Sequence, residues 1–358
     1  MTLRITLLIL VFLFPTLAKA ETGFPGYEWR ALGDGVFVHM REDPFAGPID
    51  GNSTVIINDE DVFVIDTHIN PAAARAVIEK IKSLTAKPVT HVINTHWHDD
   101  HVNGNQAFID AFPDVKILSH PDTLSQLQEE WPGFIENRQE GFAEASPERI
   151  REAADAAEAE DPDKAITYRV YAGYVEALKP ELHNLVAAYP DETIAEQKTF
   201  TRGKRKIVVE WVGPGNTPGD LVVWLPEEKI LITGDILVGP IPYAFDAPML
   251  EWPETLQKLA GFEAERIVPG HGQPQKDTDY LFQVASLIRE TVSQVEKAAE
   301  SGVAYENLRE VMDLKTQKDM FTKGDPVAVN AWTNYYFGPA LQSAWSALGY
   351  SVPEDEMP

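Results

Sequence analysis

The chain has 358 residues, of which 44% are hydrophobic and 24% charged, and its formal net charge is -26. That length is enough for one large domain or two small ones, and the composition is that of an ordinary globular protein. So negative a chain repels phosphate backbones and anionic membrane surfaces, which argues against a nucleic-acid-binding function. Cysteine is absent, which excludes disulfides, cysteine metal ligands and a thiol nucleophile.

The N-terminus has the features of a secretory signal. Arg4 precedes an apolar run from Ile5 to Phe14, and Ala18-Lys19-Ala20 places small residues where a signal peptidase reads them. A membrane-spanning helix needs ~20 apolar residues, about twice the length of this run. We therefore predict a signal peptide over residues 1–20 and a periplasmic or secreted mature chain, with no membrane contact after cleavage.

The first half of the mature chain alternates predicted strands and helices, as in α/β folds. Apolar, β-branched runs predict a strand at 35–39, a hairpin of 52–57 with 62–66, and further strands at 89–94 and 115–119. Helical periodicity predicts helices at 71–84 and 103–112.

The pattern changes at about residue 122. From there to about 195 the sequence predicts a helical insertion, in which Ser146-Pro147 begins one helix. Strands are then expected at 207–212, 221–225, 230–233 and 266–269, with a helix at 253–259. A helical C-terminal region is expected over about 276–350, including a long amphipathic helix at 281–299.

Side chains of the kind that bind metals are concentrated directly after the strand at 89–94. Four of them lie within six residues: His96, His98, Asp100 and His101. Imidazole nitrogen and carboxylate oxygen suit zinc, and sometimes manganese or iron. The alternating spacing allows several ligands to converge on one point, so this loop is predicted to bind metal at the edge of a sheet.

This run resembles the HxHxDH signature of the metallo-β-lactamase superfamily. Four further segments resemble motifs of that family in the same order: Asp66 at a strand end, Gly213 to Asp220 (GxGHTxGD), Thr233 to Asp235 (TGD), and Pro269 to Gly272 (PGHG). The resemblance implies an αββα sandwich over 21–358, an α/β fold with its metals at one edge between the sheets. Asp66 is implied to support the metal loop without binding metal itself.

One position departs from the family pattern, because Asn216 stands where the family usually has His. The resemblance implies one complete metal site, formed by Asp100, His101, His271 and a bridging Asp235. The other site would keep His96, His98 and Asp235. A neutral amide oxygen is a weaker ligand than imidazole, so we expect one tight zinc site and a second that is weak or absent. Alternatively, His96 and His98 serve without metal, as hydrogen-bond donors or a proton relay.

The resemblance implies a zinc-dependent hydrolase in which hydroxide held by the metal attacks a carbonyl carbon of a small-molecule substrate. Asp100 would orient the hydroxide, and Asn216 or the metal would polarise the carbonyl. A β-lactam amide is the first choice of substrate; thioesters, as in the glyoxalase II branch, and lactones are alternatives, and sulfate esters are a more distant one. A degenerate, non-catalytic metal-binding protein also stays open, as does the oligomeric state.

The sequence gives less weight to other sites and chemistries. Gly-x-Ser-x-Gly, Walker and strand-linked Gly-x-Gly-x-x-Gly motifs are absent. The flavodiiron branch would be expected to carry Glu at the position of His98, and the acidic charge and the signal disfavour the nuclease branch. His68 and His120 each follow a strand that feeds the metal loop, so they are placed near the site by position alone.

Overall fold

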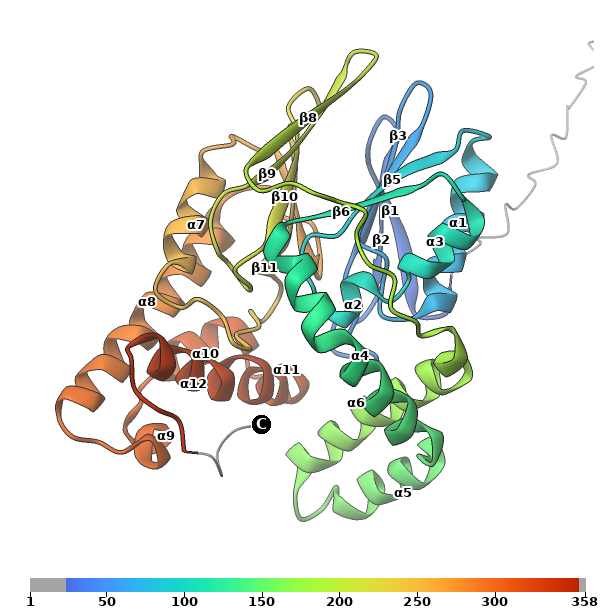
Figure 1. Cartoon of the computed structure of the whole chain (residues 1–358). Helices are drawn as coiled ribbons and strands as arrows, with labels where there is room; N and C mark the ends of the chain where they lie inside the picture. Colours follow the sequence, from blue (N-terminus) through green and yellow to red (C-terminus); the bar gives the residue numbers. More distant parts are fainter. Residues whose placement is uncertain (1–23, 354–358) are drawn as a thin grey trace, which may run out of the picture.

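The structure, a computed structural model, describes residues 24–353. The predicted signal peptide lies outside them. Two sheets pack face to face, with helices on both outer faces (Figure 1). This is the αββα sandwich that the sequence predicted.

The first sheet has seven strands in the order β1-β2-β3-β4-β5-β6-β7. Its strands are β1 (Tyr27–Gly33), β2 (Val36–Arg41), β3 (Ser53–Ile57), β4 (Val62–Ile65), β5 (Val89–Ile93), β6 (Lys116–Ser119) and β7 (Glu192–Thr193). The predicted hairpin is confirmed, since β3 pairs antiparallel with β4. β5 is parallel to both β4 and β6, so these strands end at the same edge.

The second sheet has five strands in the order β12-β11-β10-β9-β8. They are β8 (Gln197–Arg202), β9 (Arg205–Trp211), β10 (Leu221–Leu225), β11 (Ile230–Val238) and β12 (Arg266–His271). β11 and β12 run parallel, and both carry ligand-type residues near their ends. Apolar side chains from the facing strands of both sheets form the central core, for example Ile65 and Val223.

Helices cover the outer faces because each has one apolar stripe to bury. On the first sheet lie α1 (Pro71–Leu84) and α3 (Asn105–Ala111), packed through Val77, Ile81 and Phe108. On the second lie α7 (Trp252–Ala260) and α8 (Asp279–Glu300), with α12 (Gly338–Ala347) in the same core.

The predicted helical insertion joins β6 to β7 and β8. It consists of α4 (Pro121–Ala143), α5 (Pro147–Ala157), α6 (Pro162–Leu178) and the 3-10 helix η1 (Lys179–Asn184). As predicted, Ser146 caps α5, its side chain accepting a hydrogen bond from the Arg149 amide. No helix within residues 24–353 is both long and apolar enough to cross a membrane.

The C-terminal region after α8 is also helical, as predicted. It contains η2 (Tyr305–Asn307), α9 (Leu308–Val311), α10 (Lys315–Thr322), α11 (Pro326–Ala331), the π-helix η3 (Trp332–Phe337) and α12. In Figure 1 these helices and those of the insertion lie at the same end of the sandwich. The two regions are in direct contact, because the Asn330 amide donates to the Asp163 carbonyl at 2.9 Å.

Candidate metal centre

The metal loop begins where β5 ends. His96 lies in the bend formed by residues 95–97, His98 stands in extended backbone at the N-cap of the short helix α2 (Asp99–Val102), and the helical turn then carries Asp100 and His101. The change from extended to helical backbone brings alternating and consecutive side chains to one place. The convergence predicted from the spacing is therefore present in the structure.

The first group of ligand-type side chains is His96, His98 and Asp235, whose ligand atoms all lie within 4.8 Å of one another. Nε2 of His96 is 3.0 Å from Nδ1 of His98 and 3.8 Å from Oδ2 of Asp235. His96 and Asp235 are buried, whereas His98 is half-buried.

The second group is Asp100, His101 and His271. Nε2 of His271 is 3.0 Å from Oδ2 of Asp100 and 3.4 Å from Nε2 of His101. Asp235 reaches this group as well, with Oδ1 3.3 Å from His101 Nε2 and Oδ2 3.4 Å from His271 Nε2. Asp235, a member of the first group, thus also contacts two residues of the second group, as a bridging ligand must.

The donor set fits divalent cations. Each group holds two imidazoles and one carboxylate, which is the chemistry of zinc sites. The ligands come from both halves of the sandwich, because the loop after β5 belongs to the first sheet and Asp235 and His271 to the second. Backbone packing makes the approach possible: a Cβ on Gly270 would lie 1.8 Å from Oδ1 of Asp235.

In the second group, protons on the two histidines offset the negative charge of the nearby carboxylates. Burial disfavours the charged form of His271, but the carboxylates of Asp235 and Asp100 outweigh it and raise its pKa to about 9. The pKa of His101 is raised for the same reason, against the effect of its burial. Burial lowers the pKa of His96 and of His98. A cation entering the second group must therefore displace protons, whereas His96 and His98 are already neutral.

Asp66 supports the loop without joining either group. Its Oδ2 accepts hydrogen bonds from His101 Nδ1 and Thr95 Oγ1, each at 2.8 Å, and its Oδ1 accepts one from the Thr95 amide at 2.8 Å. The Nδ1 bond orients the His101 ring so that Nε2 faces the second group. The role that the resemblance implied for Asp66 agrees with these contacts.

Replacing Asp66 with asparagine should lower zinc affinity about 10- to 100-fold, the usual cost of losing a carboxylate that orients a ligand histidine. Asp61→Asn is the matched control, because Asp61 is a buried carboxylate at the other end of β4 and pairs with Arg202 at 2.6 Å. Competition against a zinc chelator measures both. Equal affinity of the Asp66→Asn variant and the unmodified chain would contradict this role.

Asn216 is buried, and within residues 24–353 only the nitrogen of its side-chain amide makes a hydrogen bond. Nδ2 donates to the Tyr243 carbonyl at 2.8 Å, whereas Oδ1 is buried without a hydrogen-bond partner among the described residues. The sequence led us to expect that Asn216 or the metal polarises the substrate carbonyl, a role that Asn216 could fill by donating from its amide nitrogen. The structure shows that this nitrogen is held by Tyr243, so the oxygen is the atom left for a cation or a water molecule.

Two histidines that position alone had placed near the site belong to neither group. His68 is hydrogen-bonded to His39 at 2.8 Å and lies 3.2 Å from Asp50, in a separate buried cluster. His120 accepts the Asp122 amide at the start of α4 and stacks on Trp211.

Another contributor to the site, Asn52, was not predicted from the sequence. Its amide donates to the carbonyls of Pro269 and Gly272, each at 2.9 Å, and so fixes the backbone on both sides of His271. An asparagine at the start of a strand has no feature that would predict this contact.

Comparison with known proteins agrees with the fold and the groups. The sequence model of the metallo-beta-lactamase superfamily matches residues 46–271. A linear primary-alkylsulfatase from a Pseudomonas species is 25% identical over 252 residues, which cover 66% of this chain and 44% of the relative. The match thus spans less than half of that enzyme.

Two proteins named as metallo-beta-lactamases are also similar. The type 2 enzyme of Bacteroides fragilis is 22% identical over 267 residues, covering 73% of this chain and 84% of the relative. The solved structure of a metallo-beta-lactamase from Pontibacter korlensis has a TM-score of 0.51 at 22% identity, covering 74% of this chain and 99% of the other. At that identity the structural likeness shows the fold. With the family model matching well over half of the chain, this protein belongs to the metallo-beta-lactamase superfamily.

Proposed function

We propose that this protein is an exported, zinc-dependent hydrolase that cleaves a carbonyl substrate. The observation that supports it most is the pair of neighbouring ligand groups that Asp235 connects. A divalent cation there would lower the pKa of water from 15.7 toward about 7, which provides a nucleophile at neutral pH. One tight zinc and a weak second one follow from the asparagine at position 216.

Asp100 is the side chain that we assign to proton handling. Its carboxylate is 14% exposed, compared with 2% for Asp235, so substrate and water reach it more readily. Without metal, the positive charge of His101 and His271 keeps the pKa of Asp100 well below its usual range, against the effect of burial, and a bound cation that displaces their protons would favour the ionised carboxylate in the same way. An ionised carboxylate at this position orients the attacking water and then carries its proton to the leaving group.

A β-lactam amide is the substrate class that we place first, on the likeness to the Bacteroides fragilis enzyme. A second candidate is a sulfate ester, favoured by the likeness to the alkylsulfatase. Thioesters and lactones remain alternatives, because the same arrangement of ligands serves those carbonyl groups equally well.

The decisive experiment is a hydrolysis screen on purified, zinc-loaded protein with metal content counted. The panel holds a chromogenic cephalosporin, S-lactoylglutathione, dihydrocoumarin and dodecyl sulfate. Turnover of at least one of the three carbonyl compounds, lost with a chelator and restored by zinc, supports the proposal, whereas metal-dependent turnover of dodecyl sulfate alone would support the second candidate. Metal binding without turnover of any would instead favour a non-catalytic metal-binding protein.

Export is a separate part of the proposal and has its own test. We expect the mature protein to begin at Glu21, because Ala18-Lys19-Ala20 ends the apolar N-terminal run. N-terminal sequencing of protein from the periplasm or the medium checks this. Protein that still begins at Met1 would contradict it.

A further inference from the structure

Three tyrosines from distant parts of the chain meet beside the ligand groups. Tyr243, in the loop between β11 and α7, has its ring centroid 4.9 Å from that of His271. The ring of Tyr335, from η3, lies 5.2 Å from the ring of Tyr243. Tyr174, from α6, packs on the same small apolar cluster as Tyr243, together with Ile49. The insertion and the C-terminal region thus each add one phenol ring to the cluster that contains Tyr243, whose own ring contacts the ligand His271.

This arrangement is held from two sides. A Cβ on Gly173 would lie 2.3 Å from the Gly47 carbonyl oxygen, so α6 meets the loop before β3 backbone to backbone. Nδ2 of Asn330 donates to the Asp163 carbonyl and, at 3.1 Å, to Oγ1 of Thr167, which ties the C-terminal region to α6. The three rings are therefore fixed by the fold and do not depend on one mobile loop.

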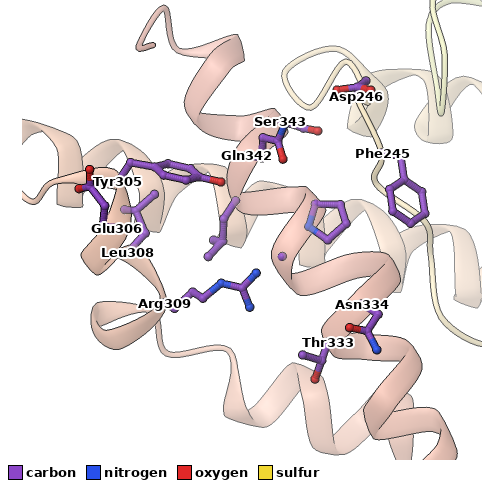
Figure 2. A pocket seen from close by; sticks show the side chains of 13 residues that line it. Phe245, Asp246, Tyr305, Glu306, Leu308, Arg309, Thr333, Asn334, Gln342 and Ser343 are labelled. Carbon is purple, nitrogen blue, oxygen red and sulfur yellow. The ribbon is translucent and has the colours of Figure 1, made fainter. Parts of the chain in front are cut away.

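The backbone of η3 is itself unusual. π-Helical turns are rare and occur often at functional sites. On this segment Thr333 and Asn334 line a separate cavity of about 430 Å³, together with Phe245 and Arg309 (Figure 2). The next residue, Tyr335, contacts Tyr243 instead. The π-helix thus presents adjacent side chains to two different places.

The group of tyrosines is uncharged. The hydroxyl of Tyr174 donates to the Ile49 carbonyl at 3.3 Å, and Tyr243 is almost fully buried. Burial raises the pKa of Tyr335 to about 12. Arg138, the cation that acts on Tyr174, is paired with Asp99 at 2.9 Å. The three side chains therefore contribute aromatic rings and no charged group of their own, and the hydroxyl of Tyr174 is already used within the protein.

We propose that Tyr174, Tyr243 and Tyr335 form one wall of the substrate site and select an uncharged aromatic or apolar substituent beside the scissile bond. The proposal rests on the proposed function, because it places the reacting group of the substrate at the ligand groups. Tyr243 lies nearest to the ligands, while Tyr174 and Tyr335 determine which substituent fits beside it. The specificity of the chain would thus come from its two helical additions to the sandwich.

Binding, not turnover, tests this wall. Zinc-loaded protein is titrated by calorimetry with two thiols that each offer zinc one thiolate: phenylmethanethiol, which is aromatic and carries no charged substituent, and 3-sulfanylpropane-1-sulfonate, whose negative charge sits on a sulfonate that is a poor zinc ligand. We expect phenylmethanethiol to bind about tenfold more tightly. Tyr174→Leu and Tyr335→Leu should each weaken its binding about three- to tenfold, the size of one aromatic contact. Both variants should bind 3-sulfanylpropane-1-sulfonate within about twofold of the unmodified chain, since that probe does not use the rings.

The controls lie on the same elements. Tyr171→Leu changes a tyrosine on α6 that is 39% exposed, and Asn334→Ala changes the neighbour that faces the separate cavity. Tyr335→Phe keeps the ring and should bind phenylmethanethiol like the unmodified chain. Zinc content and melting temperature report whether each variant folds. The ratio of the two affinities in the unmodified chain tests the proposal even if a variant does not fold.

The outcomes separate the two proposals. Leucine variants that fold and bind both thiols like the unmodified chain would overturn the wall, as would tighter binding of 3-sulfanylpropane-1-sulfonate than of phenylmethanethiol by the unmodified chain. Loss of aromatic binding in the leucine variants supports it. If that loss is seen while no substrate in the hydrolysis screen is turned over, the proposed function fails and the wall stands.

Discussion

Replacing Asp100 or His271 with alanine should remove zinc from the second ligand group and lower kcat/KM at least about 10³-fold, within the range expected for a lost proton-transfer group. Each residue supplies one of the three ligand atoms of that group, and they are 3.0 Å apart. Removing either one also leaves the partner buried without its compensating charge, so metal retention and rate should fall together.

The matched control is His120→Asn, which removes an imidazole outside both groups and leaves a residue that caps helices well. Elemental analysis counts the zinc, and the substrate found in the hydrolysis screen gives the rate. Full zinc and full rate in either alanine variant would show that the second group is not the tight metal site.

Asn216→His should raise the affinity of the first ligand group, His96, His98 and Asp235, for zinc at least about tenfold. The reason is that imidazole is a far better ligand than a neutral amide oxygen. The unmodified chain should hold closer to one zinc than two. The geometry favours the exchange. An imidazole Nδ1 could donate to the Tyr243 carbonyl as Nδ2 of Asn216 now does, which leaves Nε2 for the metal.

Calorimetry combined with elemental analysis measures the two affinities. Asn216→Leu is the control of similar size without a ligand atom. It should leave zinc binding by His96, His98 and Asp235 as weak as before or weaker. Two equally tight zinc ions in the unmodified chain would overturn the prediction. Oδ1 of Asn216 would then be an adequate ligand, since His68 is already bonded to His39.

Much of the sandwich could be predicted from the sequence because its strands are short apolar runs bounded by turns. The hairpin of β3 and β4 and the strands β5 and β12 were found in this way, whereas β11 was predicted to end at residue 233 and continues to Val238, so that Asp235 lies inside it. Convergence of the ligands in the loop after β5 followed from their spacing, and the approach of Asp235 and His271 to them was implied by the family resemblance.

Other elements could not be predicted, for physical reasons. β8 is an edge strand in which only Phe200 is buried, so it lacks the apolar pattern of an inner strand. α4 contains Pro132, which normally argues against a helix interior. The contact of Asn330 with Asp163 joins residues 167 positions apart, and a single sequence carries no signal for such a pairing. The tyrosine wall depends on that contact and was missed with it.

The origin of the ligands in both sheets has a consequence for folding. A cation bound between the loop after β5 and the ends of β11 and β12 cross-links the two halves of the sandwich, and the unfolded chain lacks this site. By mass action, free zinc at 100 times its Kd would add about 2.7 kcal/mol to the free energy of unfolding. The stability of this protein is thus expected to follow the zinc concentration of its surroundings, so that scarcity of the metal weakens the fold as well as the site.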